Sequence, residues 1–454
     1  MKRLVFPLIF ILCCLVSAHR VQASDKVVIV IDPGHGGTGD DDTENGAVYK
    51  NGLAEKDIDL ITSMAMKQEL LEYNNVEVYL TRDDDIKLSL ADRVNYASLM
   101  GADVMISCHY NASADHLFYG SEIFTSAFGT CYMTGNALGQ CIMKRWTDYG
   151  LVEKGVKVRI GKNGDDYYGV IRRGREIGLP VIIIEHGYLD NHFDFVRLGT
   201  EADWETMGRL DAAGIADYYG LSKDSVLENV LPSFYAVEPE GHAEPDVTEP
   251  EDVTLKITDL DIETSEISYE IKATDPDGRL MYYGLALGEP VEIPPGDYAD
   301  LMLWEPGKNV MTGTFTVPTG YKGKVTARVY NIYELYSDSL SVDVDMQELI
   351  DERDRLLEKE AAKEAEEARK KAEAEAEKKR IASEKAKERE QVGDFSILLG
   401  GRGGKDGKVS ETKKRKRVTA LVTVFIILSV VLLCVVIYAL RKRIIRYIRD
   451  REGF

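Results

Sequence analysis

Cysteine is scarce in this sequence, and long hydrophobic runs are confined to its two ends. Only six of the 454 residues are cysteines, and three of these lie in the terminal apolar runs. Cys108, Cys131 and Cys141 remain for the rest of the chain, which excludes a small scaffold built on disulfides. Cys131 and Cys141 are candidates for one bridge in an oxidising compartment, but isolated buried cysteines are an equally good interpretation.

Net positive charge is absent as well. The chain has 77 acidic and 56 basic residues, which gives a formal net charge of −21 at pH 7. Because nucleic-acid binding requires a basic surface that neutralises phosphates, no nucleic acid is expected as a general partner. Hydrophobic residues make up 44% of the chain, which is enough for a globular core, and the length suffices for two domains with extensions.

The N-terminal apolar run is typical of a secretory signal. Lys2 and Arg3 precede it, and Val21-Gln22-Ala23 supplies the small residues that a signal peptidase needs. Residues 1–23 are therefore predicted to be a cleaved signal peptide, with an uncleaved membrane anchor as the alternative.

The second apolar run, residues 418–440, contains 23 residues without a charge, which suits a transmembrane helix better than a buried core helix. Basic residues flank both ends, so the positive-inside rule does not fix its orientation. The signal peptide does: we expect a single-pass protein of the cell membrane, with its N-terminal part outside the cell and a short basic tail, 441–454, in the cytoplasm. Membrane lipid is thus a predicted partner.

Residues 26–221 alternate strand-like and helix-like segments. Apolar, β-branched runs predict strands, and the helical spacing of apolar residues predicts helices between them. The predicted strands are 27–31, 76–80, 104–107 and 181–184, and the predicted helices are 60–71, 88–100 and 204–219. This order indicates an α/β domain with a mostly parallel sheet that is flanked by helices.

The remainder changes character three times. An acidic stretch with several prolines, 222–250, predicts a linker, and the short alternating runs of 251–345 favour an all-β sandwich of the immunoglobulin or fibronectin type III kind. Residues 346–391 are almost entirely Glu, Lys, Arg and Ala, with opposite charges four apart. They predict a lone charged helix that serves as a stalk, with a weak coiled coil as the alternative. Residues 392–417 are predicted to be a flexible basic linker.

Residues capable of metal binding follow the predicted strands. His35 lies in a glycine-rich turn after the first strand, where Asp32 is placed to orient its ring, His109 follows the third strand, and Glu185 ends the last. Such strand ends meet at one edge of a parallel sheet. Two histidines and a glutamate are a common ligand set for catalytic zinc, which leaves a position open for water. We therefore predict Zn²⁺ at His35, Glu55 and His109, with Glu185 as the catalytic residue that moves a proton.

Each of these residues also has an ordinary interpretation when taken alone. Glu55 opens a predicted helix, where an acid stabilises the positive end of the helix dipole. The glycine-rich turn competes with a phosphate-binding loop, although its spacing fits no such motif. Glu185 can be capped by the turn that follows its strand.

Six segments resemble the zinc-dependent N-acetylmuramoyl-L-alanine amidases of the Amidase_3 type, which hydrolyse peptidoglycan. They are IDPGHGG at 31–37, NGLAEKD at 51–57, YLTRDDD at 79–85, LADRVNYAS at 90–98, SCHYNAS at 107–113 and LPVIIIEHGYLDN at 179–191. The resemblance extends over residues 26–221. It implies a mostly parallel sheet of about six strands, zinc on His35, Glu55 and His109, and Glu185 as the acid/base. It also implies cleavage of the amide between N-acetylmuramic acid and L-alanine, in cell-wall remodelling or cell separation.

Other residues in and near these segments are assigned supporting roles. Asn111 and Arg82 match family positions, and we expect Asn111 to support substrate binding and Arg82 to be structural, through a salt bridge. His186 stands where the family more often has an apolar residue, so it either perturbs Glu185 or points away from it. Tyr167-Tyr168 either lines the glycan groove or belongs to a plain surface loop.

Two other functions are compatible with the residues. A zinc peptidase acting on the peptide stems would use the same chemistry and differ only in its pocket. A scaffold that kept the fold but lost catalysis would have lost one of the four site residues, and none is lost. The β-sandwich is open to a protein partner, to wall glycan or to a spacer role, and His116, His192 and His242 are expected at the surface.

Overall fold

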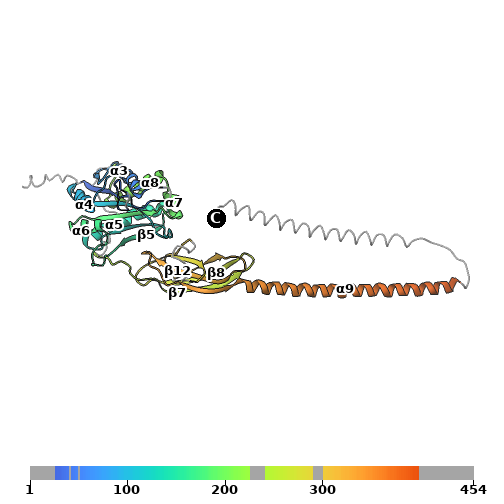
Figure 1. Cartoon of the computed structure of the whole chain (residues 1–454). Helices are drawn as coiled ribbons and strands as arrows, with labels where there is room; N and C mark the ends of the chain where they lie inside the picture. Colours follow the sequence, from blue (N-terminus) through green and yellow to red (C-terminus); the bar gives the residue numbers. More distant parts are fainter. Residues whose placement is uncertain (1–25, 40–41, 50–51, 225–240, 290–299, 398–454) are drawn as a thin grey trace, which may run out of the picture. The chain divides into compact units, whose positions relative to one another are not determined.

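The computed structural model describes residues 26–39, 42–49, 52–224, 241–289 and 300–397 (Figure 1). The predicted signal peptide, transmembrane helix and basic tail lie outside these residues, as do parts of the two predicted linkers. Among the residues described, no helix is both long and apolar enough to cross a membrane.

A six-stranded sheet forms the centre of the first domain. Its strands are β1 (Val27–Pro33), β2 (Val76–Leu80), β3 (Val104–Asn111), β4 (Ser121–Thr125), β5 (Glu153–Val158) and β6 (Val181–Tyr188). Their spatial order is β2-β1-β3-β6-β4-β5, and only the pairing of β4 with β6 is antiparallel. The prediction of a mostly parallel sheet of about six strands is thus confirmed. Sequence reasoning missed β4 and β5, because Lys154, Gly155 and Lys157 interrupt the apolar pattern of β5.

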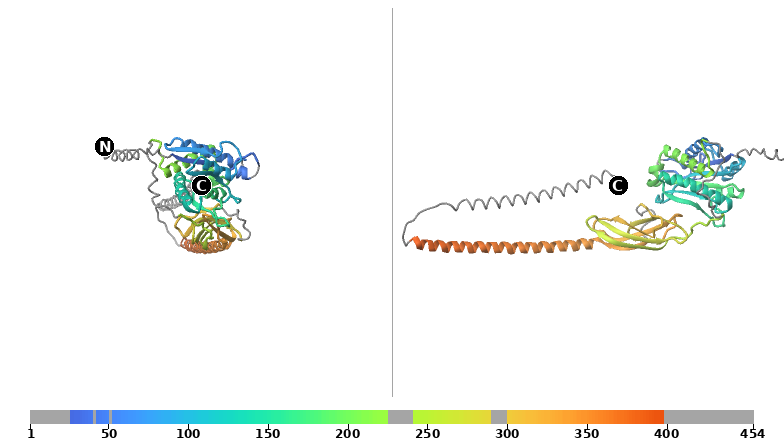
Figure 2. Two further views of the ribbon diagram at one scale, coloured as in Figure 1. Left: turned by 90° about the vertical axis from the view of Figure 1, so that its left-hand side faces the viewer. Right: turned by 180° about the vertical axis from the view of Figure 1, so that it is seen from behind.

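Helices cover both faces of this sheet (Figures 1 and 2). On one face α3 (Glu55–Leu70), α5 (Gly129–Tyr149) and α8 (Glu201–Tyr219) pack together, and on the other lie α4 (Leu90–Leu99) and α6 (Gly169–Glu176). The short helices are α2 (Asp42–Asn45) and α7 (His192–Leu198). Ile29, Ile31 and Ile106 are fully buried between the layers, and burial of each such side chain contributes about 1.5–3 kcal/mol.

The cysteines of α5 do not form the disulfide that we considered. Cys108, Cys131 and Cys141 are all buried free thiols. Because Cys131 and Cys141 lie ten residues apart on one helix, about 15 Å of helix rise separates them. A disulfide needs Cα atoms within about 7 Å, so these cysteines act as small apolar side chains.

The second domain contains two antiparallel sheets. One has the order β10-β9-β12-β13 and the other β11-β8-β7. The strands are β7 (Glu251–Asp261), β8 (Glu266–Thr274), β9 (Leu280–Leu287), β10 (Met302–Leu303), β11 (Val310–Thr316), β12 (Lys322–Asn331) and β13 (Leu340–Asp345). Alternate residues, such as Ile267, Tyr269 and Ile271 of β8, point into the core between the sheets. The β-sheets that alternating polarity predicts for residues 251–345 are therefore present.

This β domain packs directly on the α/β domain. Tyr119, which follows β3, and Tyr282 of β9 belong to one buried apolar cluster with Leu117 and Tyr330. The Tyr282 hydroxyl donates to the carbonyl of Tyr119, and the Tyr119 hydroxyl donates to the carbonyl of Leu301 at 2.9 Å. Buried apolar side chains and paired polar groups are together typical of a well-packed interface between domains.

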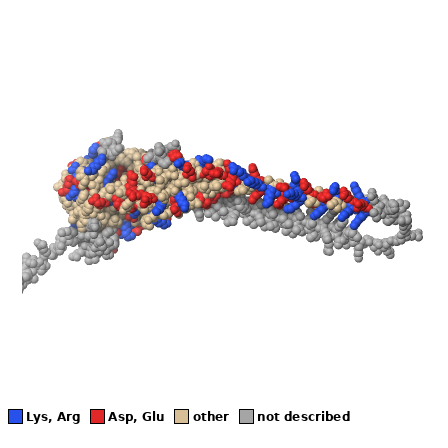
Figure 3. Space-filling model, turned by 90° about the horizontal axis from the view of Figure 1, so that it is seen from below, with Lys and Arg blue, Asp and Glu red and all other residues tan. Residues whose placement is uncertain are grey.

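A single helix, α9 (Met346–Ile397), follows β13. Its 52 residues correspond to about 78 Å of rise. Acidic and basic side chains are interspersed along it (Figure 3), with ion pairs four residues apart such as Glu366–Lys370 at 2.6 Å and Glu375–Lys379 at 3.0 Å. The long charged helix predicted from this pattern is present. It extends six residues beyond the predicted end at 391, and none of its side chains described beyond Leu356 is buried.

Candidate active site

Three of the predicted site residues meet at the carboxyl edge of the sheet. Glu55, which is 5% exposed, places Oε1 3.3 Å from Nε2 of His35 and 3.0 Å from Nδ1 of His109. The two imidazole rings are 5.0 Å apart, edge to face. Glu55 also accepts backbone N–H bonds from Ala47 at 2.8 Å and Tyr110 at 3.2 Å. The carboxylate is thus held in one orientation toward both rings.

The charges of this cluster suit a cation. Burial opposes ionisation of Glu55, but its hydrogen bonds with His109 and His35 outweigh this and keep its pKa well below the usual range. Burial lowers the pKa of His109, which favours the neutral ring that a metal ion requires. A carboxylate that faces two imidazole rings is the donor set of a catalytic zinc site.

Asp59, one helical turn beyond Glu55 on α3, adds a second argument for a cation. Four potential ligand atoms lie within 4.8 Å of one another, one each from Asp59, His35, Glu55 and His109. Asp59 is fully buried, and neither carboxylate oxygen has a hydrogen-bond partner among the described residues. A buried carboxylate left this way is costly unless a positive charge lies nearby. The residues present therefore fit a divalent metal ion.

The loop that carries His35 is held in a strained conformation. His35 has φ 53°, and Gly36 and Gly37 also have positive φ, a region that residues with a side chain rarely adopt. A side chain at Gly34 would collide with the ring of His109. The glycines therefore allow the loop to approach strand β3 closely enough for the two histidines to face one ligand.

Two buried arginines donate hydrogen bonds to the backbone of this loop. Arg82 donates to the carbonyls of Pro33 at 3.1 Å and Gly34 at 2.6 Å, and Arg93 donates to the carbonyl of His35. Arg82 is therefore structural as expected, but it acts on backbone carbonyls, and no salt bridge from it occurs within the described part of the chain. The expectation that Asp32 orients the His35 ring was wrong in detail. Its oxygens bind Thr81, Arg93 and Ser107, so it reaches His35 through Arg93.

Glu185 lies beside this cluster on β6, opposite His109 in the register of β3 and β6. Its Oε2 is buried and has no hydrogen-bond partner among the residues described. Burial first, and then the nearby charges of Glu55 and Glu122, raise its pKa well above the usual range. Glu185 can therefore hold a proton near neutral pH, which suits a general acid/base.

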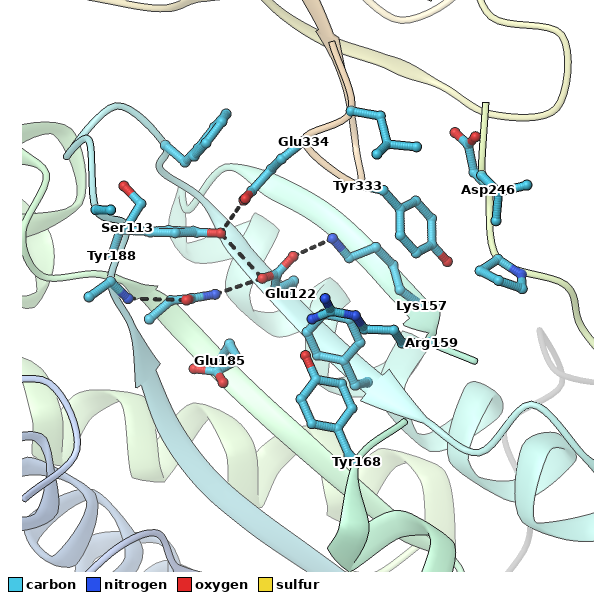
Figure 4. Close-up of a pocket in the computed structure, with 18 of the residues that line it drawn as sticks. Ser113, Glu122, Lys157, Arg159, Tyr168, Glu185, Tyr188, Asp246, Tyr333 and Glu334 are labelled. Atoms are coloured by element: carbon cyan, nitrogen blue, oxygen red, sulfur yellow. Dashed lines mark hydrogen bonds and ion pairs between the residues drawn. The ribbon is translucent and has the colours of Figure 1, made fainter. Parts of the chain in front are cut away.

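Glu185 opens onto a cleft of about 560 Å³ (Figure 4). The α/β domain supplies Asn111, Lys157, Arg159 and Tyr168, and the β domain supplies Tyr333, Glu334 and Leu335. Asn111, predicted to support substrate binding, lines this cleft and donates to Glu122 at 2.6 Å. Of the tyrosine pair, Tyr168 lies in the cleft wall.

A buried network of charges joins the two domains next to this cleft. Lys154 and Lys157 of β5 are both nearly inaccessible, and Glu122 of β4 forms an ion pair with each of them. Glu334 of the β domain pairs with Lys154 and accepts from the Tyr188 hydroxyl. Burial opposes the charge of Lys154, but Glu122 and Glu334 raise its pKa. Two buried lysines are thus balanced by two glutamates, one of which comes from the β domain.

His186 does not perturb Glu185. Its ring points into the helix layer, where Nε2 lies 2.8 Å from Asp211 and Nδ1 lies 3.0 Å from the carbonyl oxygen of His109. The ring also stacks on Tyr110, with centroids 4.7 Å apart. His186 therefore supports the strand of His109 from behind. The other histidines, His116, His192 and His242, are exposed as expected.

Sequence reasoning missed Asp59 and most residues of the cleft wall, although it named Asn111 and, as one alternative, Tyr168. Asp59 could have been found, because it lies four residues after Glu55 and hence on the same helix face. Glu122, Lys154 and Lys157 lie on strands that sequence reasoning did not identify, and Glu334 lies about 150 residues beyond Glu185 along the chain. No local pattern links it to the site.

Comparison with known proteins places this geometry in a family. The family profile Amidase_3, N-acetylmuramoyl-L-alanine amidase, matches residues 29–217. The solved catalytic domain of CwlV, an N-acetylmuramoyl-L-alanine amidase from Bacillus (Paenibacillus) polymyxa var. colistinus, is 28% identical, covering 43% of this chain and 99% of that one with a TM-score of 0.36.

Two curated relatives are more similar in sequence. The N-acetylmuramoyl-L-alanine amidase CwlM of Bacillus licheniformis is 33% identical over 206 residues, which covers 44% of this chain and 71% of that protein. The sporulation-specific N-acetylmuramoyl-L-alanine amidase of Bacillus subtilis is 30% identical over 201 residues, with the same coverage. Together with the site geometry, these matches show that the chain belongs to the Amidase_3 family and is an N-acetylmuramoyl-L-alanine amidase that acts on peptidoglycan.

Proposed function

We propose that this amidase is zinc-dependent and that His35, Glu55 and His109 hold the ion. The observation that carries the proposal is the convergence of both rings on Oε1 of Glu55, within 3.3 Å, beside a buried Asp59 whose oxygens have no hydrogen-bond partner among the described residues. When bound there, zinc polarises the amide carbonyl and lowers the pKa of water.

The remaining chemistry belongs to Glu185. Its carboxylate takes the proton of the water that adds to the carbonyl carbon between the lactyl group and L-alanine. It then gives that proton to the amide nitrogen as the carbon–nitrogen bond breaks, so that L-alanine leaves with a free amine. The raised pKa of Glu185 supports this double role, because a group that takes and returns a proton works best with a pKa near the operating pH. Asn111 and the cleft wall support the substrate.

We further propose that the enzyme works outside the cell, tethered to the membrane. The support comes from the sequence: the signal-like residues 1–23, and the uncharged run 418–440 between basic clusters. The helix α9 would then serve as a stalk in cell-wall remodelling or cell separation. Membrane fractionation with and without residues 418–440, combined with protease treatment of intact cells, tests this part.

The catalytic proposal is tested with the full chain and purified peptidoglycan. New N-terminal L-alanine should appear with zinc, disappear after treatment with a chelator, and return when zinc is restored. Glu185→Gln should abolish this release while the protein still binds zinc in an equilibrium assay. Glu176→Gln, an exposed change on α6, is the matched control and should behave as the unaltered protein. Hydrolysis at another stem bond would overturn the amidase mechanism, and full activity after verified zinc removal would overturn the metal assignment.

A further inference from the structure

Among the described residues that line the cleft beside Glu185, Arg159 forms no ion pair, although Asp115 and Asp246 line the same cleft. Two cationic side chains line the cleft, Lys157 and Arg159. Lys157 is buried and forms an ion pair with Glu122. Arg159 is exposed at the cleft, and over the stretches that the structure covers no carboxylate forms an ion pair with it. One guanidinium is therefore available to a ligand.

Aromatic rings orient this guanidinium. It lies over the ring of Tyr167, 4.0 Å from the centroid, and 6.0 Å from the centroid of Tyr168. Tyr168 packs in turn on Phe124 of β4, with ring centroids 4.8 Å apart. Stacking occupies the face of the guanidinium, and a hydrogen bond joins it to the Tyr168 side chain. The remaining N–H groups, which lie in its plane, can donate to a ligand. An arginine held in this way is prepared to bind a carboxylate through two parallel hydrogen bonds.

The position of Arg159 links it to the reaction. Figure 4 shows Arg159 beside Tyr168, on the same side of the cleft as Glu185, with Tyr333 and Glu334 of the β domain on the other side. Glu334 is engaged by Lys154 and Tyr188, so it does not neutralise Arg159. A peptide with its scissile amide at Glu185 that extends along the cleft comes within reach of Arg159.

We propose that Arg159 binds a free carboxylate of the stem peptide, and that it selects stems that keep this carboxylate over stems in which it is a carboxamide. The inference rests on the proposed function, since it takes Glu185 as the reacting end of the cleft. A carboxylate offers two acceptors to the guanidinium. A carboxamide offers only one acceptor, its carbonyl oxygen. Its NH₂ group is a donor and would point at the N–H donors of the guanidinium, so the bidentate contact is lost.

The test uses the full-length, zinc-loaded protein and two muramyl peptides that differ only in a carboxylate or a carboxamide on the second stem residue. The unaltered protein should prefer the carboxylate form by about tenfold or more in kcat/KM, as expected for a charge-assisted hydrogen bond. Arg159→Gln should lower kcat/KM for the carboxylate form by about tenfold, mainly through KM. Its kcat/KM for the carboxamide form should stay within about twofold of the unaltered value, because that substrate makes no such contact. Arg159→Lys should retain part of the preference, because it keeps the charge but not the planar fork.

The matched control is Arg173→Gln, which removes the same charge from an exposed position on α6 outside the cleft and should leave both substrates unaffected. Equal losses on both substrates after Arg159→Gln would assign Arg159 a structural part and overturn the inference. Equal rates of the unaltered protein on both substrates would overturn it too, while leaving the amidase mechanism intact. If the unaltered protein released L-alanine from neither peptide nor from peptidoglycan, both the inference and the catalytic proposal would fall.

Discussion

His186 and Asp211 form a fully buried pair behind the site, with Nε2 and Oδ2 2.8 Å apart. The other oxygen of Asp211 accepts the indole N–H of Trp146 at 2.8 Å, and the other ring nitrogen of His186 faces the carbonyl oxygen of His109. Both partners of the histidine ring, the Asp211 carboxylate and the His109 carbonyl oxygen, are hydrogen-bond acceptors. Each of these two hydrogen bonds needs one proton, so the ring and the carboxylate hold two protons between them. One carboxylate thereby fixes a ring that supports the strand of a site residue.

Loss of Asp211 should therefore destabilise the amidase domain strongly. Asp211→Ala leaves the buried ring of His186 and the indole N–H of Trp146 without an acceptor, and the free energy of unfolding should fall by about 3–5 kcal/mol. Urea unfolding monitored by tryptophan fluorescence measures this change. Asp203→Ala, in the first turn of α8, is a control that should lose only the capping box with Thr200, about 1 kcal/mol. Equal losses for the two variants would contradict the importance of the buried pair.

The contribution of Asp59 to metal binding should be measurable as a change in stability as well as in activity. Without metal, Asp59→Asn should change the melting temperature little, because burial raises the pKa of the Asp59 carboxyl well above its usual range and the variant replaces one neutral buried group by another. With zinc, the variant should gain less stability than the unaltered protein does, because an amide cannot lose a proton and place a negative charge beside the ion. Differential scanning calorimetry with and without zinc gives both shifts, and an unchanged zinc response in the variant would argue against a role of Asp59 near the ion.

The β domain should be required for a stable catalytic domain. Glu334→Gln removes one of the two glutamates that balance Lys154 and Lys157, and removal of one partner from a buried ion pair costs about 3–5 kcal/mol. Because Glu334 is partly exposed, the lower part of this range is expected. Thermal unfolding of the full chain measures the loss. Glu251→Gln, an exposed change on β7, should leave stability within about 0.5 kcal/mol of the original.

Asp194 gives the amidase domain a defined dependence on pH. Burial raises its pKa to about 6, against the backbone N–H bonds from Tyr188 and Gly120 that favour the charged form. Because the folded state holds this proton more tightly than the unfolded state, its contribution to stability is complete below about pH 4. That contribution falls as the pH rises to about 6, in total by roughly 3 kcal/mol.

Asp194→Asn should remove this pH-dependent contribution to the free energy of unfolding. The variant should match the original in stability near pH 4 and exceed it above pH 6. The difference between the two unfolding curves across this range isolates Asp194 from other titrating groups. A difference that does not change with pH would show that the carboxyl is ionised throughout.

The catalytic edge could be predicted from sequence because each of its residues stands next to a recognisable element. His35, His109 and Glu185 follow apolar strands, and adjacent parallel strands bring such positions together without knowledge of the loops. The strands β4 and β5 could not be predicted in the same way. β5 buries two lysines, and their burial is possible only because Glu122 and Glu334, distant in the chain, neutralise them.

The same distance explains why the cleft escaped prediction. Its far wall comes from residues after β12, and nothing local in Tyr333-Glu334-Leu335 indicates a neighbour in another domain. The direction of His186 was also open, because one histidine beside Glu185 can face either side of the sheet. Its partner Asp211 settles the direction only once α8 is placed on that face.

The shared charge balance also bears on how such enzymes can exchange parts in evolution. A recombination event that joined residues 26–221 to a foreign anchor would transfer Lys154 without Glu334 and leave a buried positive charge uncompensated. A break in α9 beyond Leu356 would keep all four charged side chains and the β-domain core in one piece. The unit that such an exchange must keep together is therefore the pair of domains with the first turns of α9, because Met346 is buried in the β-domain core.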